Sequence, residues 1–189
     1  DDIEVNFVKL VSRNKFYFSF SDFTFASSLS FGFEKNLSTD FLLDGNGNVT
    51  YNVDGNIQTA GYIPSIKVFR LEGIDGIRGF SDEEINRTES GSDISDTIIQ
   101  NEAYFINYKF ESRYSIGDNL IFAMFFDAGS VYIDHFKPLK LRTSVGGSFK
   151  FLTPVGTLDL DYGIKLIRKY NAHNQKERFG RFHLTIGFF

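Results

Sequence analysis

The side chain with the most distinctive chemistry lies in one glycine-punctuated stretch, Leu71–Ile85, which reads LEGIDGIRGFSDEEI. This stretch carries Arg78, followed by Gly79 and Phe80, directly before an acidic, serine-rich segment. A guanidinium presents planar, bidentate donors that suit carboxylates, and a glycine beside it permits a tight backbone turn. Two interpretations of Arg78 are open: an arginine bound to carboxylates inside the fold, or a solvated arginine in a mobile loop.

Catalytic chemistry has no support in the sequence. The three histidines, His135, His173 and His183, lack metal-ligand spacing, and no nucleophile elbow or phosphate-cradling loop occurs. The stretch Asp44–Asn56 is rich in glycine and asparagine but lacks the nonapeptide spacing of calcium-binding repeats. We expect a projecting hairpin there, because these residues favour turns. We therefore expect no enzyme activity, no cofactor and no metal.

Composition excludes several further classes of protein. The chain has 189 residues and a formal net charge of -4, so neither nucleic-acid binding nor a polybasic membrane tail is indicated. The absence of cysteine excludes disulfides and thiolate metal sites. No apolar run approaches the roughly 18 residues of a transmembrane helix. The opening DDIEVNFVKL does not resemble a signal peptide, so we interpret the chain as a processed form or a fragment.

The alternation of apolar and polar residues predicts long β-strands. In Ala103–Ser115 (AYFINYKFESRYS), one face carries mostly aromatic residues, and the other carries Asn107, Lys109, Glu111 and Arg113. No segment has the pattern of an amphipathic helix. The same alternation predicts seven antiparallel strands near residues 3–17, 23–35, 102–115, 119–133, 138–152, 156–169 and 178–189.

The length of these strands favours a membrane barrel over a soluble β-sandwich. Each reaches the roughly 9–11 residues that a tilted strand needs to cross a bilayer, whereas soluble strands average about 5–6 residues. Short turns alternate with long connections, as at the two rims of such a barrel, and we expect residues 36–101 to form a long extracellular loop region. Seven strands do not close a barrel, so we predict that residues 1–189 are the C-terminal part of a larger one.

Several motifs resemble those of one family in their order along the chain. The stretch LEGIDGIRGF resembles a loop-six motif, and Phe110–Ile116 (FESRYSI) and Phe122–Tyr132 (FAMFFDAGSVY) resemble two strand motifs. Leu141–Gly163 resembles a strand pair joined by a Thr-Pro-(Val/Leu)-Gly turn, and RFHLTIGFF resembles the last strand. The set resembles the barrel of the outer-membrane assembly-factor and two-partner secretion transporter family (BamA-type). That resemblance implies a barrel of about sixteen strands.

The resemblance also implies a luminal loop latch. In the family, the loop-six arginine folds into the barrel lumen and meets acidic groups on the wall, which here correspond to Glu111 and Asp127. Strand alternation independently places both carboxylates on the polar face. Gly79 would allow the turn and Phe80 would pack on the wall. We expect the acidic stretch 81–96 to be a solvated loop, with an interaction site as the alternative. We expect no individual task for the remaining mixed luminal lining. The lining residues are Arg142, Lys150, Asp159, Asp161 and Lys165.

The last strand carries the second implied site. In the family, a C-terminal strand ending in an aromatic residue is recognised by edge pairing and forms a weak lateral seam. The ordinary alternative is the closing strand of any barrel. The residues concerned are Phe182, Leu184, Ile186, Gly187, Phe188 and Phe189.

For function, the resemblance implies a factor that inserts β-barrel proteins into the outer membrane of a Gram-negative bacterium or secretes proteins across it. An organelle outer membrane is the alternative location. The implied partners are the lipid bilayer, unfolded client proteins or a secreted passenger, accessory lipoproteins, and barrel strands and POTRA repeats outside this chain. An ordinary porin or autotransporter-like barrel that conducts solutes remains an alternative function, and a soluble binding module is a third.

Overall fold

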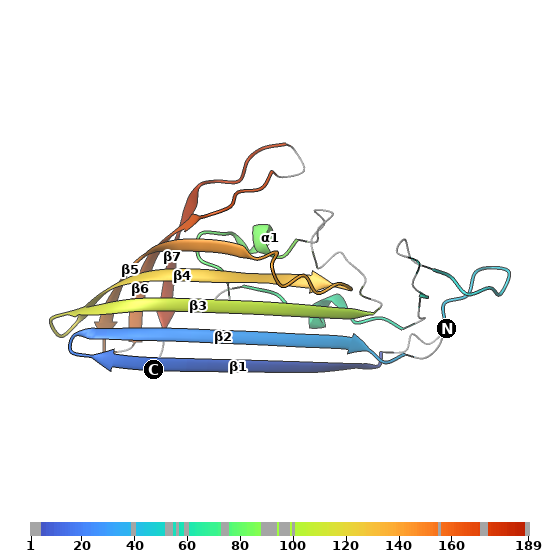
Figure 1. The fold of residues 1–189 in the computed structure, drawn as a ribbon, viewed down its shortest axis with the longest axis horizontal. Helices are drawn as coiled ribbons and strands as arrows, with labels where there is room; N and C mark the ends of the chain where they lie inside the picture. Colours follow the sequence, from blue (N-terminus) through green and yellow to red (C-terminus); the bar gives the residue numbers. More distant parts are fainter. Residues whose placement is uncertain are drawn as a thin grey trace.

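The computed structural model contains one seven-stranded antiparallel sheet whose strands lie side by side in chain order (Figure 1). It describes residues 5–38, 41–51, 55, 57–58, 61–72, 76–87, 94, 99, 101–154, 156–170 and 174–187. The strands are β1 (Phe7–Phe20), β2 (Phe23–Asn36), β3 (Glu102–Ile116), β4 (Leu120–Ile133), β5 (Arg142–Thr153), β6 (Gly156–Lys165) and β7 (Gly180–Gly187). The predicted all-β antiparallel fold is confirmed.

Local hydrogen bonding explains where the strand ends differ from the predicted ones. β1 runs to Phe20, because the turn to β2 needs only Ser21 and Asp22, with Ser21 at a positive φ of 52°. β5 begins at Arg142 and not near residue 138, since the Lys140 amide donates to the Lys137 carbonyl and closes a turn there. The apolar–polar alternation continues into the turn before β5, so the pattern alone starts this strand too early, whereas it ended β1 too early.

The two faces of the sheet differ in polarity. Large apolar side chains such as Met124, Phe149 and Leu184 are exposed on the convex face. Aromatic pairs join neighbouring strands there, including Phe122 and Phe149, whose ring centroids lie 5.3 Å apart. The concave face buries polar and charged side chains. They include Glu34, Asn107, Glu111, Asp127, Arg142, Lys150, Asp161 and Lys165.

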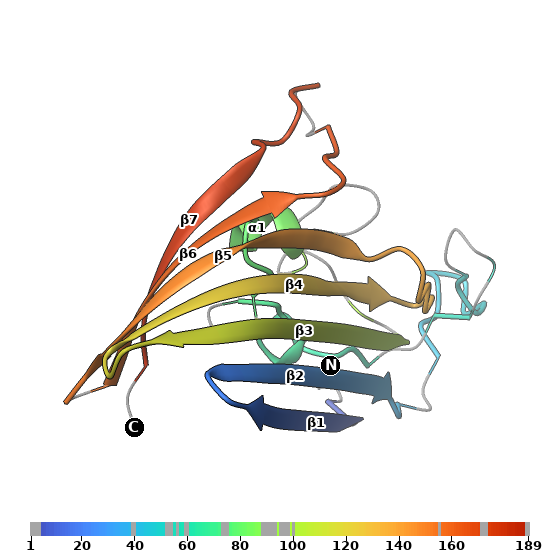
Figure 2. The ribbon, with the colours of Figure 1, turned by 60° about the vertical axis from the view of Figure 1, so that its left-hand side comes forward.

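The sheet curves strongly, and its connections differ in length at its two ends (Figures 1 and 2). The β1–β2, β3–β4 and β5–β6 turns are short and lie together at one end. The β2–β3, β4–β5 and β6–β7 loops are long and start from the other end. Among the described residues, no helix is both long and apolar enough to cross a membrane.

The β2–β3 loop (residues 37–101) packs part of its length against the concave face. Ile63, Leu71 and Ile77 from the loop share a buried hydrophobic cluster with Phe105 of β3 and Val131 of β4. This cluster fills the space beside the polar wall, so the interior of the curved sheet combines an ionic region with an apolar one.

A short helix in the same loop corrects the expectation of a solvated acidic segment. Helix α1 (Asp82–Ile85) has a capping box at its N-terminus. The Ser81 hydroxyl accepts a hydrogen bond from the Glu84 amide, and the Glu84 carboxylate accepts one from the Ser81 amide. Ile85 and Asn86 are buried. The prediction is therefore wrong for this part of stretch 81–96. A 3₁₀ turn, η1 (Ser65–Lys67), lies earlier in the described part of the same loop.

The two faces of β2 provide a test of the membrane-facing assignment. We expect Leu29→Glu, on the convex face, to lower the unfolding free energy of the full-length protein in lipid vesicles by about 2 kcal/mol, because it places a charge against lipid. The adjacent Ser28→Glu is the matched control, since Ser28 lies on the concave face between Lys15 and Lys109. The measurement is the urea midpoint from heat-modifiable gel mobility. Equal losses in the two variants would contradict the assignment.

Candidate functional site

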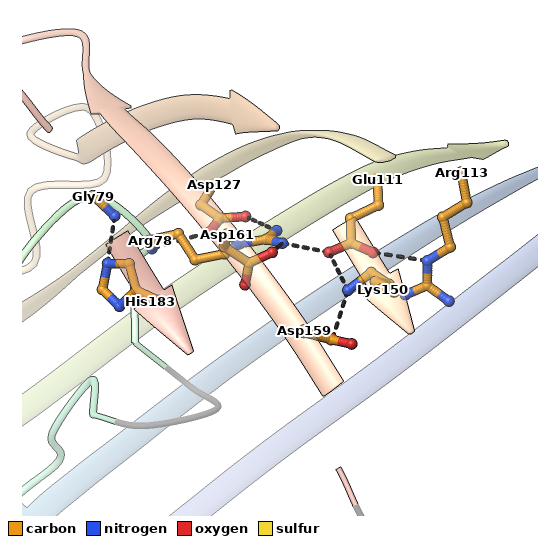
Figure 3. Close-up of polar contacts among 9 residues, drawn as sticks. All are labelled: Arg78, Gly79, Glu111, Arg113, Asp127, Lys150, Asp159, Asp161 and His183. Carbon is orange, nitrogen blue, oxygen red and sulfur yellow. Dashed lines mark hydrogen bonds and ion pairs between the residues drawn. The ribbon is translucent and has the colours of Figure 1, made fainter. Parts of the chain in front are cut away.

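Arg78 is held on the concave face by Asp127 of β4 (Figure 3). Its Nε donates to Asp127 Oδ2 at 2.8 Å, and its Nη2 donates to Oδ1 at 2.7 Å. The backbone amide of Arg78 also donates to Oδ2, at 3.1 Å. Asp127 is fully buried, and the Arg78 side chain is 11% exposed. The carboxylate therefore fixes both the side chain and the backbone of the loop at this point.

A second carboxylate, Glu111 of β3, receives the remaining end of the guanidinium through Nη1. Glu111 is itself shared, because Arg113 Nε donates to its Oε2 at 2.7 Å and Lys150 Nζ lies 3.7 Å from its Oε1. Lys150 also binds Asp159 at 2.7 Å. One continuous ionic network thus crosses strands β3 to β6 (Figure 3). Its cations are Arg78, Arg113 and Lys150, and its carboxylates are Glu111, Asp127 and Asp159.

The environment of Arg78 strengthens these contacts. Its guanidinium carbon lies 3.6 Å from the centroid of the Phe125 ring, which excludes water from one face. Burial alone would lower the pKa of Arg78, but the hydrogen bond and charge of Asp127, with the charge of Glu111, outweigh it and raise that pKa above its ordinary value. Arg78 therefore remains charged at every physiological pH.

Two glycines let the loop backbone approach the sheet closely enough for this binding. Gly79 has a φ of 92°, a conformation that side chains of other residues disfavour. On β6, a Cβ at Gly163 would lie 2.5 Å from the Gly79 nitrogen and 2.6 Å from the Arg78 carbonyl carbon. Both positions therefore require glycine for the loop to sit at its observed depth.

The structure adds a partner that the sequence did not indicate. The amide of Gly79 donates to Nε2 of His183 on β7 at 2.9 Å, so the loop is tied to the seventh strand as well as to β3 and β4 (Figure 3). Strand alternation places His183 and Arg181 on the same, polar face of β7, but the contact of His183 with the loop depends on a tertiary path that the sequence does not reveal.

Phe80 and helix α1 form a second attachment of the loop. Phe80 is buried, and the charged groups of Arg142 and Lys165 lie 4.6 Å and 5.0 Å from its ring centroid. Lys165 Nζ also binds Glu84 Oε1 at 2.5 Å. Burial alone would raise the pKa of Glu84, but the hydrogen bond and charge of Lys165 and the hydrogen bonds from Ser81 together outweigh it, so this pKa lies below its ordinary value. Arg142 and Lys165, which were expected to be part of a general luminal lining, thus have specific partners in the loop.

We define the luminal latch as Arg78, Gly79 and Phe80 together with Glu111 and Asp127. The structure brings all five together on the concave face. On the last strand, Phe182, Leu184 and Ile186 are exposed on the convex face, and Gly187 pairs with Thr157 of β6. Phe188 and Phe189 lie outside the described residues.

No group of three or more histidine, aspartate or glutamate residues in the described part of the chain could hold a metal ion. The charged groups of Arg78, Glu111 and Asp127 are engaged in ion pairs and hydrogen bonds, and those of Arg78 join the loop to the wall. The arrangement can hold a loop against a sheet.

Three features define the class of protein: an apolar convex face, an ionic concave face, and short turns opposite long loops. The chain forms part of a transmembrane β-barrel. Within that class, the chain belongs to the Omp85 superfamily, whose domain model matches residues 3–189.

One similar protein is the outer membrane protein assembly factor BamA of Nitratidesulfovibrio vulgaris, with 27% identity over 132 residues. The match covers 68% of this chain and 16% of that protein. The chain therefore spans about one sixth of the length of the curated relative that it matches.

Gly163→Ala tests the close approach of the loop. The added methyl group would meet the backbone of Arg78 and Gly79, so we expect the loop to shift and the protein to lose about 1–3 kcal/mol of stability. Hydrogen exchange in residues 76–87 should increase. Gly147→Ala on β5 is the control, because its Cβ would meet no atom closer than 3.9 Å. Unchanged exchange in the Gly163 variant would contradict the proposed packing.

The Glu84–Lys165 pair predicts a pH-dependent contribution to stability. Because the pKa of Glu84 is lowered in the fold, its contribution is complete above the ordinary value of 4.5 and is lost as pH falls through the lower folded value. The difference in urea midpoint between the wild-type protein and Glu84→Gln should be constant above about pH 5 and narrow in more acidic buffer. A difference that does not change with pH would exclude a charged Glu84 as the anchor.

Proposed function

We propose that this chain is the C-terminal part of the barrel of an outer-membrane factor that inserts β-barrel proteins into the membrane or secretes proteins across it. The observation that carries the proposal is the luminal latch, because its five residues occupy the positions expected from the family resemblance. Membership of the Omp85 superfamily and similarity to a BamA protein support the same activity.

The physical role proposed for the latch is mechanical. Arg78 binds two carboxylates on neighbouring strands, and the adjacent Gly79 binds His183 on β7. The loop therefore connects β3 and β4 to the last strand through the barrel interior. Templating of client strands would occur at the barrel seam near β7, and the latch would set the position of that strand relative to the wall. This function needs no chemical step and no cofactor.

The proposed location is the outer membrane of a Gram-negative bacterium, with the convex face against lipid. Proposed partners are unfolded outer-membrane clients or a secreted passenger, accessory lipoproteins, and barrel strands and POTRA repeats outside this chain. Edge pairing is the physical basis for client binding, since an open strand edge offers unpaired amides and carbonyls.

A solute-conducting barrel is the second candidate function. One observation favours it: a cavity of about 880 Å³ lies beside the latch and is lined by polar and charged side chains, among them Ser28, Lys109 and Asp159. A wet, charged lumen is a property of porins. The latch would then act as a plug, and its removal would raise conductance without affecting other membrane proteins.

Arg78→Ala distinguishes the two functions in cells depleted of the wild-type protein. We expect a several-fold fall in folded client barrels or secreted passenger, with normal membrane insertion of the variant, because Asp127 and Glu111 lose their shared cation. Arg70→Ala is the matched control, since Arg70 lies in the same loop and pairs with the exposed Glu72. The measurement is heat-modifiable mobility of outer-membrane proteins.

Client and passenger levels that stay normal in Arg78→Ala would count against the proposal. If planar-bilayer conductance of the variant rises at the same time, the porin function is favoured instead.

A further inference from the structure

A second cavity borders the luminal latch at Gly79 and has no role in the function proposed above. Its volume is about 1040 Å³, close to the upper end of the range of small-molecule sites. It is lined by residues of helix α1, the ends of β5, β6 and β7, and the β6–β7 loop. Lys165 lines it and lies 5.0 Å from the centroid of the Phe80 ring.

Arg142, at the start of β5, is the most unusual residue of this cavity. Its side chain is 6% exposed, and one nitrogen, Nη2, binds Glu177. Its guanidinium faces the Phe80 ring. Its Nε and Nη1 are buried and have no hydrogen-bond partner in the part of the chain that the structure describes. Buried donors of a charged group without acceptors are costly, so this position favours a ligand that accepts hydrogen bonds.

The charge of the cavity indicates what kind of ligand this is. Among the described lining residues there are seven arginines and lysines and three glutamates. Two of these glutamates already have cationic partners, since Glu84 binds Lys165 and Glu177 binds Arg142. The cations are Arg87, Arg142, Lys165, Lys169, Lys176, Arg178 and Arg181. The excess of positive charge favours an anion, and planar guanidinium donors favour phosphate oxygens.

We propose that this cavity binds a phosphate-bearing anion, with the Arg142 guanidinium as its principal hydrogen-bond donor and Arg87 and Arg178 supplying further positive charge. The cavity exceeds the size of inorganic phosphate and has room for a diphosphate or a phosphorylated sugar. Its ligand would join α1 of the β2–β3 loop to the β6–β7 loop. Two sources share this chemistry: a soluble phosphate compound and the phosphorylated headgroup of a membrane glycolipid.

Inorganic pyrophosphate is the soluble probe, and isothermal titration of the full-length protein in detergent is the measurement. We expect saturable binding that weakens as salt increases. The double variant Arg142→Gln/Glu177→Gln removes one charge of each sign, so it leaves net charge unchanged while removing the guanidinium donors. Binding by the double variant should be about ten- to a hundredfold weaker.

Two further variants control for charge and folding. Glu177→Gln alone removes the competing carboxylate, so its affinity should equal or exceed that of the wild-type protein. Lys35→Gln changes an exposed lysine of β2 outside the cavity lining and should bind as the wild-type protein does. Heat-modifiable mobility checks that every variant is folded. Undetectable pyrophosphate binding, or equal affinity in the wild-type protein and the double variant, would overturn a soluble-phosphate ligand.

Nanodiscs that contain a bis-phosphorylated glycolipid, or the same lipid without phosphates, distinguish the two sources. Arg142-dependent binding that needs the lipid phosphates, in the absence of pyrophosphate binding, would assign the site to a membrane headgroup. The reverse result would assign it to a soluble compound. If neither probe binds in an Arg142-dependent manner, the proposal is wrong.

Discussion

The packing on the concave face of this sheet depends on the neutralisation of one buried arginine, Arg78, by carboxylates. A guanidinium surrounded by Phe125 and the barrel wall loses most of its hydration, and a buried charge is tolerated only with a well-placed counter-ion and satisfied hydrogen bonds. Asp127 supplies a bidentate partner and Glu111 supplies a second charge. Both carboxylates project from paired strands, so their separation is set by the sheet and the loop must adapt to it.

Apolar packing and close backbone contact then fix the rest of the loop. Ile63, Leu71 and Ile77 cover Phe105 and Val131, and this burial orders the segment on either side of the latch. The Gly79–Gly163 contact sets the depth of the loop, and the Glu84–Lys165 pair anchors the residues that follow. Electrostatic and apolar contacts thus act on different parts of one loop, and neither alone would hold it against the sheet.

The sequence predicted the sheet and the polarity of its faces because side-chain direction alternates with a period of two along any strand. That rule placed Glu111 and Asp127 on one face, and the family resemblance paired them with Arg78. It did not predict the Gly79–His183 bond or the partners of Lys165, which depend on the path of a loop through space. Helix α1 does have a signal in the sequence, since Ser81 and Glu84 have the spacing of a capping box.

Strand β6 contacts strand β5 and the β2–β3 loop through every second residue. Asp159 binds Lys150 of β5, and Asp161 lies 3.8 Å from Arg78 of the loop. Gly163 packs against Gly79, and Lys165 binds Glu84. Inserting or deleting one residue within β6 would turn the following positions to the lipid side and present apolar residues to the interior. Over evolutionary time, length changes within β6 must therefore come in pairs of residues or be accommodated by a bulge.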